Sequence, residues 1–425
     1  MSEEDAVPGA DTLASVVIAR LGARGDGLTA DGLAVPGALP GERVSIRRTG
    51  ERADLAAVEA PSPERTEPFC PYYARCGGCS VQHLARDAYR DWKRGLVADA
   101  LGRAGIATDL APLVDAHGAG RRRLTLHVRE IDGRARAGLM AARSHTLVPI
   151  AYCPITVPAL HRAPAVAEAL SAPLGHGRKP LDALLTATET GLDVDLRGHG
   201  PVSDAVRLVL TRLADALDLA RLSLHGDVVV ERRPPVLRSG TSRLAPPPGG
   251  FLQATEVGET ALAGLVRAAM DRRVKRVADL FSGAGPFTLA LAESSDVHAV
   301  EDDAAALAGL DRAARAASGR RRITCERRDL FRRPLLGPEL DRFDAVVFDP
   351  PRAGAGAQAA RLAESAVPLV VGVSCDPGTF ARDAATLLGG GYRLERVTPV
   401  DQFAWSGHVE LVGVFRKAPV KRRRL

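Results

Sequence analysis

Six cysteines, and carboxylates at the ends of predicted strands, carry most of the chemistry that this 425-residue sequence offers. Cys375 directly follows the apolar stretch Val370–Ser374 and precedes Asp376-Pro377. A cysteine thiolate can add to an electron-poor ring carbon, which makes Cys375 a candidate nucleophile. A lone cysteine at the end of an apolar strand is more often a buried packing residue, so its context has to decide between the two roles.

The other five cysteines fall into two classes. Cys70, Cys76 and Cys79 form a Cys-x5-Cys-x2-Cys cluster, and Cys153 lies much later in the chain. Four thiolates suit tetrahedral zinc or an iron–sulfur cubane, and this spacing by itself favours zinc. Cys325 belongs to neither class, and we interpret it as an ordinary buried residue.

A glycine-rich turn in the last third of the chain predicts a ligand site. The predicted strand Val274–Phe281 runs into Ser-Gly-Ala-Gly-Pro at 282–286, and a helix is expected to follow. Glycines such as Gly283 allow a ligand to approach the backbone closely at the start of a helix. A single Gly-x-Gly is usually only a tight turn, so its interpretation depends on the residues at the ends of the later strands.

Three carboxylates lie at the ends of the next three predicted strands. Glu301 comes about twenty residues after the turn, at the spacing of a carboxylate that binds ribose hydroxyls. Asp329 is suitably placed to contact an adenine amino group, and Asp349 closes the fourth strand. Open α/β sheets bind ligands at the carboxyl ends of their strands, so we expect these groups to share one edge.

The elements that must position these residues form three predicted domains. Residues 12–60 alternate β-prone stretches with turn signals, which predicts a small OB-like β-barrel. Residues 61–245 predict a mixed α/β central domain, and residues 246–425 alternate strands with helices, as in a parallel α/β sheet. The breaks fall at Pro61–Glu64 and at Ala245–Gly250, both rich in turn-forming residues.

The overall charge favours a polyanionic partner. The chain has a net charge of +6, although the run Arg121-Arg122-Arg123 taken alone is interpreted as a solvated face. No apolar run approaches the ~20 residues of a membrane span, and the acidic start is unlike a secretory signal. We therefore expect a cytoplasmic protein without a membrane partner, with reduced thiols, that acts as a monomer.

The glycine turn, the carboxylates and Asp349-Pro350-Pro351 together resemble class I S-adenosylmethionine-dependent methyltransferases. Nicotinamide binding is the alternative, but a full Gly-x-Gly-x-x-Gly is missing. The resemblance implies a Rossmann-like fold with a seven-stranded sheet, whose antiparallel last strand would come from His408–Phe415.

Four separated motifs, in order, resemble the RNA 5-methyluridine methyltransferase family. They are Phe251–Thr255, Asp349–Gly354, Ser374–Asp383 and Phe403–Glu410. Carbon 5 of uracil is too poor a nucleophile to attack a sulfonium methyl unaided, and addition of Cys375 at carbon 6 would turn the ring into an enolate that can do so. Glu410 is our candidate for the base that then removes the carbon 5 proton.

The same resemblance assigns further residues. It implies that Phe251 packs near the target base and that six residues contact S-adenosylmethionine: Gln253, Phe281, Gly283, Glu301, Asp329 and Asp349. The chain departs from the family at three positions, since Thr255, Pro286 and Asp376 stand where asparagine is usual or occurs in some members.

Two other functions compete with uridine methylation. Cytosine carbon 5 methyltransferases usually carry proline before the nucleophile, where this chain has Ser374. A non-catalytic RNA-binding assembly factor would be expected to have lost Cys375 or Glu410, and both are present.

The first two predicted domains also resemble parts of this family. Residues 21–28 and 35–44 resemble the TRAM RNA-binding module, and the sequences around Cys76–His83 and Ser144–Cys153 resemble the 4Fe–4S site of the ribosomal-RNA branch. This implies a 4Fe–4S cluster on the four cysteines, acting as a structural clip. The combination favours structured RNA of the large ribosomal subunit, 23S ribosomal RNA, with transfer RNA as the alternative.

Overall fold

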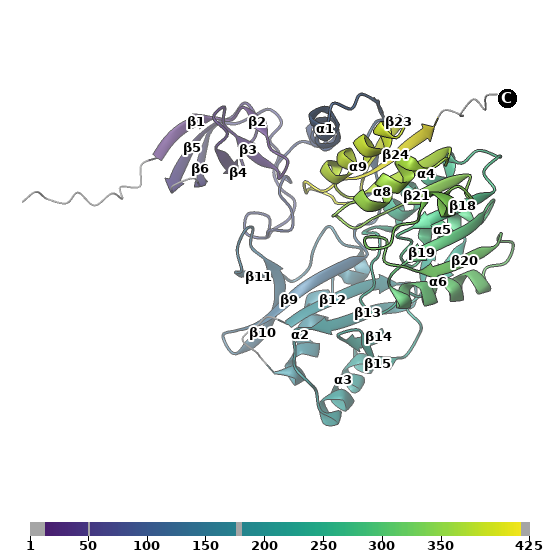
Figure 1. Cartoon of the computed structure of the whole chain (residues 1–425). Helices are drawn as coiled ribbons and strands as arrows, with labels where there is room; N and C mark the ends of the chain where they lie inside the picture. The colour runs from purple at the N-terminus through teal and green to yellow at the C-terminus, as the bar shows by residue number, and fades with distance from the viewer. Residues whose placement is uncertain (1–12, 50–51, 176–180, 418–425) are drawn as a thin grey trace, which may run out of the picture. The chain divides into compact units, whose positions relative to one another are not determined.

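The computed structural model describes residues 13–49, 52–175 and 181–417 (Figure 1). They form two compact units. The first runs to Lys93 and also contains Trp405–Gly407, and the second comprises Arg94–Ala404 and the residues from His408 onward. No helix in these ranges is long and apolar enough to cross a membrane.

The first unit is built from short antiparallel strands, as its alternating sequence predicts. One sheet has the order β1-β5-β6 and another the order β2-β3-β4. Inward-facing Ile18, Val35, Val44 and Ile46 form their core. The strands are β1 (Leu13–Val17), β2 (Arg20–Leu21), β3 (Asp26–Leu28), β4 (Ala34–Pro36), β5 (Arg43–Thr49) and β6 (Arg52–Ala60).

The central part of the second unit is a mixed sheet with the order β11-β10-β9-β12-β13-β14-β15, packed against α2 and α3 (Figure 1). Its β9 alternates buried Leu124, Leu126 and Val128 with more exposed residues, because successive side chains of a strand point to opposite faces. The elements are β9 (Arg123–Ile131), β10 (Arg134–Met140), β11 (Leu147–Pro149), α2 (Ala163–Ser171), β12 (Leu181–Thr188), β13 (Gly191–Arg197), α3 (Asp204–Ala216), β14 (Leu219–Leu224) and β15 (Asp227–Glu231).

The C-terminal part of this unit is a Rossmann-like sheet with the order β20-β19-β18-β21-β22-β24-β23. The first five of these strands run parallel, and β24 lies antiparallel between β22 and β23. The strands are β18 (Arg276–Leu280), β19 (Asp296–Glu301), β20 (Ile323–Arg327), β21 (Ala345–Phe348), β22 (Leu369–Ser374), β23 (Tyr392–Asp401) and β24 (Glu410–Lys417). The mixed α/β fold class and the antiparallel last strand are confirmed.

The sheet is larger than the seven strands expected from the sequence. In the described part of the chain it has nine strands, because β7 (Asp109–Leu110) and β8 (Val114–Asp115) pair parallel to β23. Strands of two residues have no periodicity of their own. They form because the segment after α1 (Arg86–Arg103) runs along β23, where the amide of Ala111 donates to the carbonyl of Val397.

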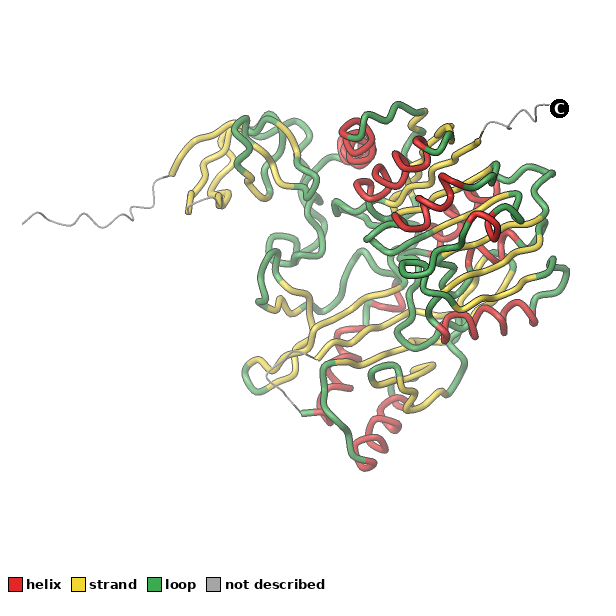
Figure 2. The backbone as a smooth tube through the Cα atoms, viewed as in Figure 1, coloured by secondary structure: helices red, strands yellow, loops and turns green. Residues whose placement is uncertain are grey.

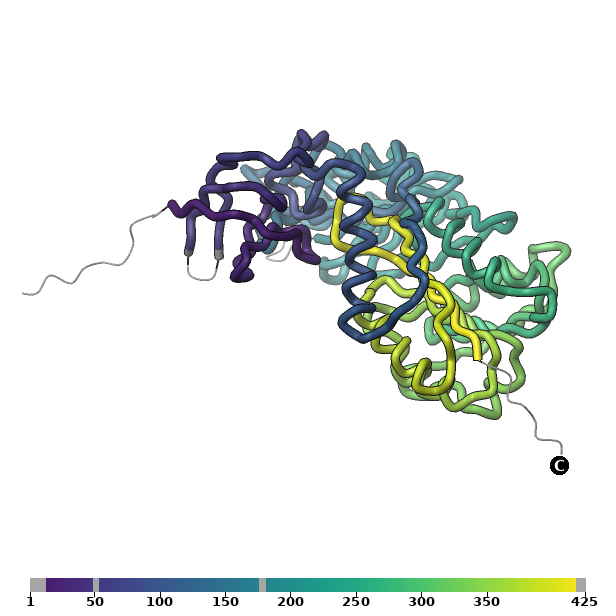
Figure 3. Tube along the Cα trace, turned by 90° about the horizontal axis from the view of Figure 1, so that it is seen from above, coloured from purple at the N-terminus to yellow at the C-terminus, as the bar shows by residue number. Residues whose placement is uncertain are grey.

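Helices cover both faces of this sheet (Figure 2). One core contains Phe380 and Leu387 from α9, and the other contains Leu262 and Val266 from α4. The C-terminal half of α1, the dark blue helix in Figure 3, contributes Val97 and Leu101 to the first core. The helices are α1 (Arg86–Arg103), α4 (Glu256–Ala269), α5 (Pro286–Leu291), α6 (Ala304–Ala316), α7 (Gly337–Leu340), α8 (Gly356–Glu364) and α9 (Pro377–Gly389).

Candidate active site

The carboxyl ends of the central parallel strands lie in step. Leu280 at the end of β18 pairs with Phe348 at the end of β21, and Phe348 pairs with Gly372 of β22. The next residues along the chain, Phe281 and Asp349, therefore emerge at one edge of the sheet. This is the edge at which open α/β sheets bind ligands.

Cys375 and Glu410 are brought together by the pairing of β22 with β24. Ser374 pairs with Leu411, so the next position in this antiparallel register sets Cys375 opposite Glu410. Opposed side chains in such a pair have Cβ atoms about 5 Å apart. Cys375 is partly exposed and Glu410 is buried. The arrangement gives a reachable thiol with a carboxylate next to it.

A buried chain of hydrogen bonds links Glu410 to Asp349. The side-chain amide of Gln402 donates to Gln253 Oε1 at 2.6 Å and to Glu410 Oε1 at 3.2 Å. Gln253 in turn donates to Asp349 Oδ2 at 3.2 Å. These four polar groups come from segments far apart in the sequence, yet they meet at the edge that carries Cys375.

The electrostatics of this cluster disfavour negative charge. Burial raises the pKa of the Cys375 thiol to about 11, and the nearby Glu410 and Asp349 add to the increase. Burial also raises the pKa of Asp349 well above its usual value, with further contributions from Glu410 and Asp279. The cation of Arg352 acts in the opposite direction on the pKa of Cys375 and favours its thiolate.

These pKa directions predict how Cys375 reacts with iodoacetamide. Only the thiolate is alkylated, so in the free protein the rate should rise about tenfold per pH unit from about pH 7 to 10, without a plateau at about pH 8 to 9. Glu410→Gln removes a charge that raises this pKa, and it should accelerate alkylation at a fixed pH. Peptide mass spectrometry measures the rate of alkylation at Cys375. Arg352→Met is the opposite control, because it removes the charge that favours the thiolate and should slow the reaction.

The glycine turn forms the second part of the site. Phe281, Gly283 and Gly285 all have positive φ, at 60°, 54° and 87°. A Cβ on Gly285 would lie 2.3 Å from a methyl group of Leu310, so this position requires glycine, whereas a Cβ on Gly283 would meet open space. The amide of Gly283 donates to Glu301 Oε2 at 2.9 Å. The turn and the carboxylate are thereby fixed to each other, with room above Gly283.

Asp329 lies two residues beyond the end of β20, in the turn after that strand. Its carboxylate accepts from the amides of Phe331 and Arg332. The ring of Phe331 is 47% exposed and lies 5.4 Å, centroid to centroid, from the ring of Phe281. This pair offers an apolar surface next to the glycine turn.

Sequence reasoning missed three buried polar residues of the site. Gln402 directly follows β23, Asp279 interrupts the apolar strand β18, and Ser282 opens the glycine turn. Burial raises the pKa of Asp279 to about 7, and Thr288 donates to its Oδ2. A carboxylate inside an apolar strand and a glutamine at a strand end are signals that could have identified two of them.

The residues present fit S-adenosylmethionine. Among the described residues, Asp279 Oδ1 and Ser282 Oγ are buried without a hydrogen-bond partner. Buried polar atoms are nearly always paired, so two such atoms, one near the end of β18 and one in the glycine turn, indicate a polar ligand. Glu301, the last residue of β19, and Asp329, two residues after β20, supply carboxylates at the same sheet edge.

The cysteines proposed as metal ligands are divided between the two units. Cys70, Cys76 and Cys79 are partly exposed in the first unit, and Cys153 is buried in the second. Burial, together with Cys70, raises the pKa of Cys76. In the ranges that the structure describes, no group of three or more cysteine, histidine or acidic residues is arranged to hold a metal ion.

The interpretation of Cys325 as a buried residue is wrong. It is exposed on β20, the strand at the edge of the sheet. An edge strand has no neighbour on one side, and a strand pattern in the sequence does not reveal whether the strand lies at the edge.

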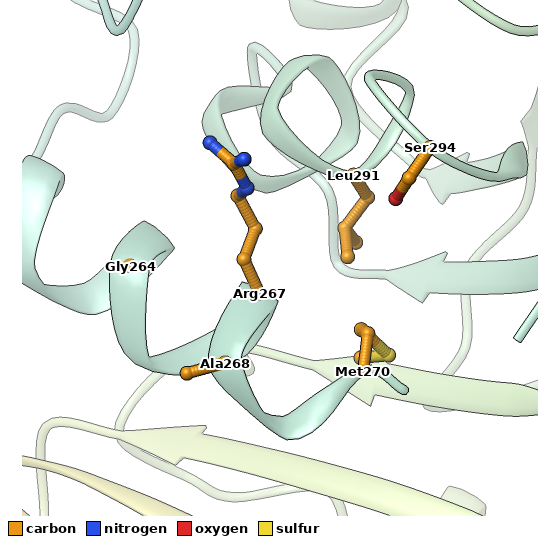
Figure 4. A pocket seen from close by; sticks show the side chains of 6 residues that line it. All are labelled: Gly264, Arg267, Ala268, Met270, Leu291 and Ser294. Atoms are coloured by element: carbon orange, nitrogen blue, oxygen red, sulfur yellow. The ribbon is translucent and has the colours of Figure 1, made fainter. Parts of the chain in front are cut away.

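A surface pocket of about 430 Å³ between α4 and α5 lies apart from this chemistry (Figure 4). Its Arg267 forms an ion pair with Glu293 at 2.8 Å. None of the candidate site residues lines it; the lining residues are Gly264, Arg267, Ala268, Met270, Leu291 and Ser294.

Comparisons with known proteins identify relatives of the whole chain. Residues 314–418 match the family model of tRNA (uracil-5-)-methyltransferases. An uncharacterized RNA methyltransferase of Brucella suis is 47% identical, covering 95% of this chain and 97% of its own. The 23S rRNA (uracil(1939)-C(5))-methyltransferase RlmD of Halomonas elongata is 36% identical, covering 88% and 83%.

A solved structure supports the fold. The tRNA (uracil-54, C5)-methyltransferase of Pyrococcus abyssi, in complex with S-adenosyl-L-homocysteine, superposes with a TM-score of 0.74 at 21% identity, covering 94% of this chain and 99% of its own. The relatives that align with most of the chain and the matching family model show that the chain belongs to the S-adenosylmethionine-dependent RNA (uracil-C5)-methyltransferase family.

Proposed function

We propose that this RNA uracil-C5 methyltransferase modifies a uridine of 23S ribosomal RNA through a covalent adduct between Cys375 and carbon 6 of the base. The observation that carries the mechanism is the register that sets Cys375 opposite Glu410. The alternative substrate is a transfer-RNA uridine, in keeping with the name of the matching family model.

The two side chains divide the reaction between them. The Cys375 thiolate adds to carbon 6, and the electron pair moves toward carbon 5 and the carbonyl oxygen. S-adenosylmethionine, when bound, would supply the methyl group that carbon 5 takes up and would be left as S-adenosylhomocysteine. Glu410 then removes the proton from carbon 5, the ring electrons return, and the sulfur–carbon 6 bond breaks. Cys375 is regenerated, and the proton remains on Glu410 until solvent takes it.

The surroundings of Cys375 support its role as a nucleophile. It lies two residues before the first residue of α9, where the positive end of the helix dipole favours an anion. Asp376 caps this helix by accepting from the amides of Gly378 and Thr379, which gives a structural reason for an acidic residue there. Arg352 supplies a full positive charge nearby.

The target base must leave its stack before both groups can reach it. Phe251 supports this step, because its large apolar side chain is 73% exposed only two residues before the buried Gln253. An exposed aromatic ring provides a stacking surface for an unpaired base. We propose that Phe251 stacks against the displaced uracil, and that Gln253 and Asp349 make polar contacts with the base and the cofactor.

The preference for ribosomal RNA is supported by the 36% identical RlmD of Halomonas elongata and by the TRAM-like sequence of the first unit.

We propose that residues 12–60 bind RNA, that residues 61–245 carry a cluster, that residues 246–425 are the catalytic domain, and that the enzyme acts as a monomer.

Mapping 5-methyluridine across total RNA, with and without this gene, tests the substrate. We expect one or more 23S sites to lose the modification when the gene is absent, and transfer RNA to keep it. Unchanged maps would contradict the enzymatic role, and loss only in transfer RNA would contradict the ribosomal one.

We further propose a 4Fe–4S cluster on Cys70, Cys76, Cys79 and Cys153. The donor set supports this, because four thiolates are the usual ligands of such a cluster. Protein purified without oxygen should contain about four irons and four sulfides per chain. Cys76→Ser should lower both, whereas Cys325→Ser should not, and stoichiometric zinc without iron would refute the assignment.

A further inference from the structure

After the central sheet the chain forms a hairpin of β16 (Leu237–Ser239) and β17 (Ser242–Leu244). Residues 246–254, which we call the strap, connect this hairpin to α4 and carry Phe251 and Gln253. The sequence predicts a domain break here, but the strap is held along its length by two arginines of the central sheet, Arg123 and Arg221, and by Arg122 directly before β9. Arg221 donates to the carbonyl of Pro246 at 2.9 Å. Arg123 donates to the carbonyls of Gly250 and Gly249 at 2.5 and 3.0 Å. Arg122 donates to the carbonyl of Gln253 at 3.1 Å.

Two of these arginines are themselves fixed by carboxylates. Arg221 forms two bonds of 2.8 Å with Asp193, and Arg122 pairs with Glu259 of α4 at 2.5 Å. Arg122 and Arg221 are each only 5% exposed. A planar guanidinium held in this way presents its remaining donors in a fixed direction. The interpretation of the Arg121–Arg123 run as a solvated face is therefore wrong for Arg122.

The third arginine binds the middle of the strap with both of its terminal nitrogens. Burial lowers the pKa of Arg123 to about 10, which still leaves it charged at neutral pH. Gly249, one of its two acceptors, has φ of +66°, and a Cβ there would lie 2.1 Å from Arg197 Nη2. The strap is thus closely packed against the end of β13 as well as hydrogen-bonded.

The strap ends in two side chains with opposite surroundings. Phe251 is 73% exposed, and Gln253 is 3% exposed within its bonds to Asp349 and Gln402. Both orientations require the intervening backbone to stay in place. Arg123 fixes the carbonyl just before Phe251, and Arg122 fixes that of Gln253 itself.

We propose that Arg122, Arg123 and Arg221 are positioning residues for methyl transfer, which hold the strap so that Phe251 and Gln253 meet the base and the cofactor. This rests on the proposed roles of those two residues. The central sheet then contributes to the reaction only through the strap, because it supplies no group that touches the reacting atoms.

The test compares Arg123→Met with Arg129→Met. Arg129 lies on the same strand, β9, and its register partner is Arg136 of β10. In Arg123→Met, the backbone amides of the strap should exchange hydrogen faster than in the wild type. The kcat should fall by about 100-fold, because a displacement of catalytic groups by about 1 Å is enough for such a loss. The KM for RNA should change less than kcat. Arg129→Met should change neither. Arg123→Lys keeps the charge without the planar fork and should recover only part of kcat.

Two results would overturn the proposal: wild-type exchange of the strap in Arg123→Met, or faster exchange together with wild-type kcat. If Arg123→Met does not fold, Gly249→Ala disturbs the same part of the strap and should give the same pair of effects. Hydrogen exchange needs no substrate, so it still tests the strap if Cys375→Ala proves active and the proposed chemistry fails.

Discussion

Cys375→Ala should reduce methylation of uridine-containing RNA below detection. Without the thiolate, no group described at this sheet edge is placed to add to carbon 6, and carbon 5 alone is too weak a nucleophile. The variant should also fail to form a denaturation-resistant adduct with RNA that contains 5-fluorouridine. In that substrate fluorine replaces the proton that the base must remove, so the wild-type adduct persists and can be seen on a denaturing gel.

Cys325→Ala is the matched control for this experiment. Cys325 is the more exposed thiol and would be the easier target of a non-specific reaction, yet it lies on the far edge strand β20. It should leave both methylation and adduct formation unchanged. An adduct that survives in Cys375→Ala and disappears in Cys325→Ala would show that the nucleophile is Cys325 and not Cys375.

The meeting of Cys375 and Glu410 could be predicted because it follows from strand order. Cys375 ends a parallel strand and Glu410 begins the antiparallel last strand, so their pairing in adjacent strands sets them side by side. The glycine turn and Glu301 were predictable for a similar reason, since both come after consecutive strands of one parallel sheet. Short-range patterns fix these positions once the fold class is known.

The groups that connect the site could not be predicted in this way. Gln402 reaches Gln253 across 149 positions of sequence, and Arg122 reaches the carbonyl of the same residue across 131. Such contacts depend on how segments far apart in the sequence pack together. Neither the charge of a residue nor the periodicity of the sequence around it predicts that packing. The run of three arginines illustrates the limit, because its composition suggests a solvated surface whereas the packing of the strap buries its middle member.

The exposed position of Cys325 has the same origin. A strand pattern in the sequence identifies a strand but not its place in the sheet, and only the sheet order puts β20 at the edge.

Glu410→Gln should lower turnover by about 10²- to 10⁴-fold, the usual contribution of a general base. The substitution is isosteric, and its amide oxygen can still accept the bond from Gln402, so the buried chain of hydrogen bonds should remain. Because addition and methyl transfer precede proton removal, the variant should accumulate a covalent complex with ordinary RNA. Denaturing gels and mass spectrometry detect this covalent complex. Its mass should exceed that of a simple cysteine–RNA adduct by one methyl group.

The same variant should make Cys375 more reactive, since loss of the Glu410 charge lowers the pKa of the thiol. Slower turnover and faster alkylation in one protein are opposite effects, and a site that was merely damaged would not be expected to show both. Loss of turnover without the methylated adduct would place Glu410 before methyl transfer, in the deprotonation of Cys375. A carboxylate that raises the thiol pKa by its charge is poorly suited to that earlier step, which is why we assign Glu410 to the carbon 5 proton.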